Sequence, residues 1–165
     1  GLHGRNVDNR RMDVFNLFRG DTAPFEDMPP GFHQREAALG ELLGGSLLGM
    51  SVYDLEPGEK TWPYHYELRE EEWLLVVAGE PTLREPEGER RVRPGDVVCF
   101  PPGPEGAHQL RNDTDERVRL ALLSRNEPGL SATVYPDSEK LGLHGPGTRY
   151  RMKIGPQLDY WEGES

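Results

Sequence analysis

Turn-forming residues divide most of this chain into segments that are too short for ordinary helices. Its 165 residues include 20 glycines and 15 prolines, and the runs between them show no sustained helical periodicity. Short apolar runs bounded by glycine and proline are typical of β-strands. The pattern therefore predicts one all-β domain, with strands at about 46–55, 61–67, 72–79, 81–85, 89–93, 96–100, 107–112, 117–124 and 131–135.

Four side chains with metal-binding chemistry fall on three of these strands. Alternate residues of a strand face the same side, so we expect His65 and Glu67 to point together. The polar residues 68–71 predict a hairpin loop that folds Glu72 back beside Glu67, and His108 opens a later strand. These two imidazoles and two carboxylates are expected to converge at one point inside a small barrel, and they are suitable ligands for a metal ion.

The same two stretches resemble the two sequence motifs of the cupin family. The first motif contains two histidines and a glutamate between glycines, and the second ends in a histidine and an asparagine. The first stretch supplies Gly58, His65, Glu67, Glu72 and Gly79. The second stretch supplies Gly95, Pro101, Gly103, His108 and Asn112. The resemblance covers about residues 46–124, and it implies a double-stranded β-helix of the jelly-roll type.

The resemblance also implies metal ligands at His65, Glu72 and His108, and it implies that Asn112 secures a strand end. The second histidine of the first motif is replaced here by Glu67, which the resemblance makes a ligand by position alone. Three interpretations stay open. The site has two histidines and two glutamates as ligands, or three ligands with Glu67 free as a catalytic base, or it is degenerate and holds no metal.

The activities that the resemblance implies are broad. Cupins include isomerases, dioxygenases, decarboxylases and lyases, and mixed histidine and carboxylate ligands suit Fe, Mn, Ni, Co or Zn. We therefore predict a divalent metal ion in a barrel pocket, in an enzyme that acts on a small polar organic substrate. The alternative is a non-catalytic barrel that binds or senses a small molecule, because a fold alone does not decide function.

Net charge and cysteine content limit the classes of partner and the cellular compartment that we expect. The formal net charge of -10 argues against nucleic acid, whose phosphates require a basic face, and against anionic membrane surfaces. No apolar run approaches the roughly 18 residues of a membrane-spanning helix. The single cysteine, Cys99, cannot form an internal disulfide. We expect a cytoplasmic protein with no nucleic-acid or membrane partner.

The segments on either side of the barrel are expected to be extensions of it. Residues 1–45 are predicted to form an N-terminal arm with a short helical or irregular segment, and residues 46–125 to form the barrel. Residues 126–165 are rich in glycine, proline and aromatic residues. We expect this last segment to pack on the barrel or on a partner subunit.

Aromatic residues in two places favour a homodimer. By strand alternation, Trp62, Tyr64 and Tyr66 are expected to face away from the pocket, where they would form one apolar patch. Tyr160 and Trp161 of the tail also need a surface to cover them. A two-fold pairing would bury the same patch on both subunits.

Overall fold

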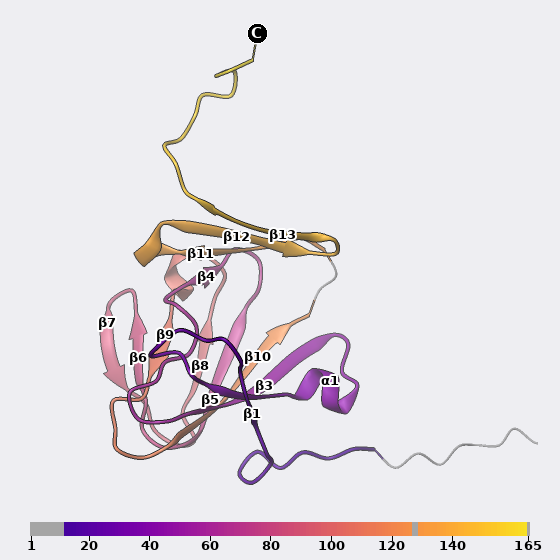
Figure 1. The fold of residues 1–165 in the computed structure, drawn as a ribbon, viewed down its shortest axis with the longest axis vertical. Coiled ribbons are helices and arrows are strands. Elements are labelled where there is room, and N and C mark those ends of the chain that lie inside the picture. The colour runs from indigo at the N-terminus through magenta and orange to yellow at the C-terminus, as the bar shows by residue number, and fades with distance from the viewer. Residues whose placement is uncertain (1–11, 127–128, 165) are drawn as a thin grey trace, which may run out of the picture.

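The computed structural model describes residues 12–126 and 129–164, and nearly all of its regular structure is β-strand (Figure 1). These residues contain one α-helix, α1 (Leu39–Leu43), and two 3-10 turns, η1 (Pro104–Gly106) and η2 (Pro136–Ser138). The all-β prediction is confirmed. No helix in the described ranges is long and apolar enough to cross a membrane.

The strands form three antiparallel sheets, and neighbouring strands are hydrogen-bonded in the orders given. The largest sheet contains, in order, β1 (Ala23–Pro24), β2 (Arg35–Ala38), β3 (Leu48–Leu55), β10 (Val118–Arg125), β5 (Glu72–Ala78) and β8 (Val97–Phe100). A second sheet contains β7 (Gly88–Arg91), β6 (Thr82–Glu85) and β9 (Gln109–Arg111). The third sheet contains β13 (Thr148–Lys153), β12 (Lys140–Gly145), β11 (Ser131–Tyr135) and β4 (Tyr66–Glu67).

The main hydrophobic core lies between the six-stranded and the three-stranded sheets. Its buried members come from both sheets and their loops: Leu55, Leu74, Val76, Leu83, Val92, Phe100, Leu110, Val118 and Leu120. Each such side chain contributes roughly 1.5–3 kcal/mol when it is fully buried. This core therefore holds the framework on which the metal-binding side chains are placed.

The outer face of the six-stranded sheet is covered by the N-terminal arm. Side chains that alternate with the main core, including Val52 and Ala121, pack against Leu39 of α1 and against Phe15 and Leu17 of the arm. The arm also supplies β2, which pairs with β3 along its whole length. The expected short helix is present, and Gly44 ends it in the left-handed conformation (φ 74°). Residues 1–11 of the expected arm lie outside the described residues.

Two segments differ from the sequence-based strand predictions. Residues 61–67 were expected to form one strand, but β4 contains only Tyr66–Glu67. Pro63 interrupts this segment, because proline lacks the N–H that a strand ladder requires. The tail contains two strands that were not expected, β12 and β13. They extend the sheet that contains β4 and β11, and Figure 1 shows this hairpin stacked at one end of the molecule.

Candidate metal centre

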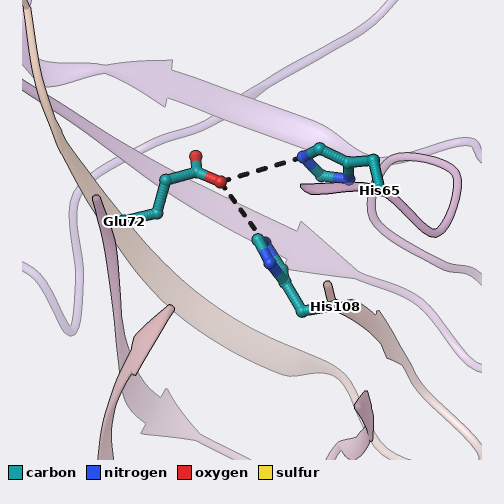
Figure 2. A group of neighbouring side chains, drawn as sticks. All are labelled: His65, Glu72 and His108. Atoms are coloured by element: carbon teal, nitrogen blue, oxygen red, sulfur yellow. Dashed lines mark ion pairs between the residues drawn. The ribbon is translucent and has the colours of Figure 1, made fainter. Parts of the chain in front are cut away.

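Three of the four predicted metal-binding residues come together at one point. His65 precedes β4, Glu72 opens β5 and His108 precedes β9. The backbones of the two histidines bond to each other, with N···O distances of 3.2 and 2.8 Å. Glu72 Oε2 lies 3.8 Å from His65 Nε2 and 3.5 Å from His108 Nε2 (Figure 2). The three ligand atoms lie within 4.8 Å of one another.

The backbone fixes which nitrogen of each histidine faces the cluster. His65 Nδ1 donates to the carbonyl oxygen of Pro63 at 2.8 Å, and His108 Nδ1 donates to that of Gly106 at 2.9 Å. With the proton on Nδ1, the lone pair of each neutral ring lies on Nε2, which faces Glu72. Phe100 stacks on the His108 ring with centroids 3.7 Å apart and so restricts its rotation. Histidine ligands in metal sites are oriented by this kind of second hydrogen bond.

The carboxylate of Glu72 has an unsatisfied oxygen at the centre of the cluster. Glu72 Oε2 is buried and has no hydrogen-bond partner among the residues that the structure describes, and such an atom is costly to bury. Ligand atoms about 2.1 Å from a shared ion lie roughly 3.0–3.5 Å apart. The separations of 3.5 and 3.8 Å from Glu72 Oε2 are close to this range. The three ligand atoms lie within 4.8 Å of one another, so the widest pair would have to approach further around an ion. These residues fit a divalent cation that is coordinated by Glu72 Oε2 and by the Nε2 atoms of both histidines.

Burial sets the protonation of the three ligands. Burial lowers the pKa of His65, and burial together with the neighbouring His65 lowers the pKa of His108 to about 3. Both rings are therefore neutral at pH 7 and can bind a metal without first losing a proton. Burial, with repulsion from Glu67 and Glu70, raises the pKa of Glu72 to about 7. A cation in the cluster would favour the ionised carboxylate.

Glu67, the fourth predicted ligand, lies in the same cavity but outside the three-residue cluster. Its carboxylate accepts a hydrogen bond from Thr133 Oγ1, at 2.8 Å to Oε1 and 3.0 Å to Oε2. Burial raises its pKa to about 7, although the Thr133 hydrogen bond acts in the opposite direction. Glu67 is therefore a carboxyl group that titrates near neutral pH beside the cluster. Its role as a fourth ligand stays a prediction.

A cavity of about 600 Å³ opens beside His65, Glu67 and Glu72. Much of its wall comes from β12 and β13, which sequence reasoning had not identified as strands or as part of the site. These wall residues include Lys140, Gly142, Leu143, His144, Arg149, Tyr150 and Arg151. No spacing in the two motifs refers to this tail. The sequence signal that could have predicted this hairpin was the alternation of Lys140, Gly142 and His144 before the glycine-rich turn at 145–147.

The expected patch of outward-facing aromatic residues is not formed, because Trp62 faces the cavity and Tyr64 is buried. Tyr66, which was also expected to face away from the pocket, does not line it. Trp62 lines the cavity and also packs edge-on against Phe25 and Tyr53. Tyr64 is only 8% exposed, and the Arg84 guanidinium lies 3.8 Å above its ring. Because residues 61–65 are not a regular strand, strict alternation does not apply to them.

Comparison with known protein families identifies the chain. The model of the cupin domain matches residues 51–124, a span that contains His65, Glu72 and His108. Residues 51–124 are therefore a cupin domain. Four glycines of the two cupin motifs, Gly58, Gly79, Gly95 and Gly103, adopt positive φ between 76° and 97°. These values are easily reached by glycine alone, which is the physical reason for the motif glycines.

Solved structures show related folds. A search of curated proteins finds no match. This cupin is similar to a proposed sugar phosphate isomerase of Acidithiobacillus ferrooxidans, with 26% identity and a TM-score of 0.71 over 79% of this chain and 84% of that one. A sugar phosphate isomerase of the cupin superfamily from Silicibacter pomeroyi has 23% identity and a TM-score of 0.76, over 90% and 98% of the two chains.

A more distant structure is the oxalate decarboxylase of Bacillus subtilis, a protein with Mn(II) centres. Its identity to this cupin is 18% and the TM-score is 0.51, over 70% of this chain and 30% of that one. At this level of identity the likeness shows a shared fold. The jelly-roll prediction is confirmed by these folds together with the family match.

Proposed function

We propose that this cupin binds a divalent metal ion through His65, Glu72 and His108, and that it is a metal-dependent enzyme acting on a small polar organic substrate. The observation that carries the proposal is the buried, unpartnered Glu72 Oε2, which faces two Nε2 atoms whose lone pairs point toward it. Imidazole and carboxylate ligands of this kind suit Fe, Mn, Ni, Co or Zn.

Glu67 is the residue we assign to proton transfer. A bound metal ion would polarise a carbonyl or hydroxyl oxygen of the substrate. A general base works best when its pKa lies near the operating pH, and the pKa of Glu67 is about 7. Thr133 holds both carboxylate oxygens of Glu67 in place. Glu67 can therefore take a proton from the carbon next to the substrate carbonyl and return it to the former carbonyl carbon, while the proton of the adjacent hydroxyl passes to the former carbonyl oxygen.

This transfer of a proton between adjacent carbons is an isomerisation. We favour it over the dioxygenase alternative because Glu67 supplies a titratable group that the metal ligation does not need. The similarity to the proposed sugar phosphate isomerase of Acidithiobacillus ferrooxidans supports the same class. The non-catalytic binder is the remaining alternative, and it requires no base in the cavity.

Metal content and isotope exchange test the proposal together. Protein purified without chelator should contain about one metal ion per chain by plasma emission. When it is incubated in D2O with a panel of small aldoses, ketoses and their phosphates, it should introduce deuterium next to a carbonyl, measured by NMR. Glu67→Gln should retain the metal and lose most of the exchange. Absence of metal would contradict the metal-dependent enzyme, and either absence of metal or metal without exchange on any compound would support the binder instead.

We also propose that the tail is covered by a second copy of the chain. Tyr160 and Trp161 are 84% and 71% exposed. Figure 1 shows the C-terminal residues, in yellow, extending away from the sheets. The aromatic residues of the tail that were expected to need a cover are thus exposed in the single chain, which supports a homodimer.

A further inference from the structure

The cavity beside the metal cluster has a cationic wall that the proposed reaction does not use. Residues paired across an antiparallel sheet carry their side chains on the same face. Glu67 of β4 pairs with Thr133 of β11, Thr133 pairs with Gly142 of β12, and Gly142 pairs with Arg151 of β13. The face of the sheet that carries Glu67 therefore also carries Arg151, three strands away.

The neighbouring rows place two more cations on the same face. Alternation along β12 puts Lys140 with Gly142, and alternation along β13 puts Arg149 with Arg151. All three cationic residues line the cavity. We call Lys140, Arg149 and Arg151 the basic wall.

The two arginines of the basic wall differ from five other arginines of this acidic chain. Arg84, Arg90, Arg111, Arg117 and Arg119 each form an ion pair with a carboxylate. Within residues 12–126 and 129–164, Arg149 and Arg151 form no ion pair, and Lys140 lies 5.4 Å from the centroid of the Tyr135 ring. In a protein with a net charge of -10, unpaired guanidinium groups around a cavity leave their donors available to a ligand.

Gly142 leaves the space between the basic wall and Glu67 open. It is the residue between Thr133 and Arg151 in the row that crosses the sheet. A Cβ atom added there would lie 3.5 Å from the Tyr135 ring, which is an ordinary contact. A Cβ atom at this position is therefore tolerated, and a longer side chain would extend from it on the face that carries Glu67 and Arg151.

We infer that the basic wall binds an anionic group, a phosphate or a carboxylate, of the substrate whose reactive end lies at His65, Glu67 and Glu72. Guanidinium groups recognise both anions through paired N–H donors. The inference rests on the proposed function for the position of the reactive end and adds the substrate class to it. It places substrate selection on a hairpin outside residues 51–124, the span of the cupin domain.

The test is calorimetric titration of the full chain with inorganic phosphate and, separately, with acetate. It is performed with the metal as purified and again after chelation. Wild type should bind at least one of the two anions in both states. Arg149→Gln/Arg151→Gln should bind it at least roughly tenfold more weakly, because it loses charge-assisted hydrogen bonds. Binding of phosphate alone identifies a phosphate-bearing substrate, and equal binding of acetate identifies a carboxylate.

Arg90→Gln/Arg117→Gln is the matched control. It removes the same charge from exposed arginines that do not line the cavity, and it should bind the anion as wild type does. Gly142→Leu keeps every charge and should also weaken anion binding by filling the cavity. Failure of wild type to bind either anion, or an equal loss in the control, would overturn the inference. Metal content measured on the protein as purified separates this inference from the metal site. Anion binding by protein that is purified without chelator and still contains no metal would contradict the proposed function and leave the anion site standing.

Discussion

Each histidine of the metal centre is held by a hydrogen bond to a nearby backbone carbonyl oxygen. The carbonyl oxygens of Pro63 and Gly106 lie two residues before His65 and His108, so each ring is oriented by the loop that carries it. Glu72 opens β5, whose Leu74 and Val76 belong to the main core. The ligands are thus placed by the barrel before any metal arrives, and the core does not depend on the ion.

Removal of one ligand should therefore remove the metal and leave the fold. We expect His65→Ala or His108→Ala to weaken metal binding by at least roughly 10–100-fold, since even residues that only orient ligands have effects of this size. Plasma emission gives the metal content, and circular dichroism should show an unchanged β-sheet spectrum. The control is His33→Ala, because His33 is exposed and bonds only to Glu59. Metal content equal to wild type in both site variants would contradict the assignment.

The buried ion pair between Asp54 and Arg119 makes stability depend on pH. Its charged atoms lie 2.7 Å apart, and the Asp54 side chain is 1% exposed. Burial alone would raise the pKa of Asp54, but hydrogen bonds from Arg119 and Thr22 outweigh it and hold the pKa below its ordinary value. Because the folded state favours the carboxylate, this stabilisation is complete above the unfolded-state pKa of about 4. It is lost as the pH falls through the lower folded-state pKa.

We expect Asp54→Asn to lower the free energy of unfolding by on the order of 3 kcal/mol at pH 7, because it leaves a buried guanidinium without its counter-charge. Urea unfolding at several pH values should show this difference shrinking below pH 4. Asp137→Asn is the control, since Asp137 is paired with Arg84 at the surface and should change stability by less than about 1 kcal/mol. If the stability difference between wild type and Asp54→Asn grows as the pH falls, the predicted pH dependence is contradicted.

The strand ends of the barrel depend on single buried polar side chains. Asn112, which was expected to secure a strand end, is fully buried. Its Nδ2 donates to the carbonyl oxygens of Leu55 and Glu116 at 2.9 and 2.7 Å. Its Oδ1 accepts from the backbone N–H and the hydroxyl of Thr114. One side chain thus joins the end of β3 to the loop that precedes β10.

Asn112→Ala should therefore destabilise the protein by about 2–4 kcal/mol, because several buried backbone groups lose their partners. Thermal or urea unfolding measures the effect. The matched change is Asn16→Ala, which removes an exposed amide that bonds only to the backbone of Phe18 and Arg19. If both variants lose the same stability, the strand-end role of Asn112 is contradicted.

Local sequence patterns predicted the elements that depend on local chemistry. Strands such as β5 and β10 were predicted because apolar runs between turn residues are visible in the sequence. His65, Glu72 and His108 were predicted as one site because the motif spacing identifies them. Strand parity failed at Trp62, because the backbone there is not a strand. The wall formed by β12 and β13 was missed because polar strands gain their stability from pairing with distant strands rather than from local pattern.

The whole molecule exposes an apolar tail that a single chain does not cover. We expect sedimentation equilibrium at micromolar concentration to give a mass near twice the 18.6 kDa of the chain. Truncation after Lys153 removes Tyr160 and Trp161 and should give a monomer with an unchanged metal content. The double variant Val14→Ser/Phe18→Ser is the control, since these residues are exposed at the other end of the chain. A mass near 18.6 kDa for wild type would exclude the dimer.

The two-residue length of β4 has a consequence for motion. β11 is paired with β4 at Thr133–Glu67 and Val134–Tyr66, with one further backbone hydrogen bond from Leu68 N–H to the carbonyl oxygen of Ala132. In contrast, β10 is paired along its length with β3 and β5. Short pairings open at a lower free energy than core strands, so hydrogen–deuterium exchange should be faster in β12 than in β10. A ligand that contacts both the metal centre and the basic wall would hold the strands β11, β12 and β13 against β4. Ligand binding would then slow hydrogen–deuterium exchange in the β12–β13 hairpin, although this hairpin contains none of the proposed metal ligands.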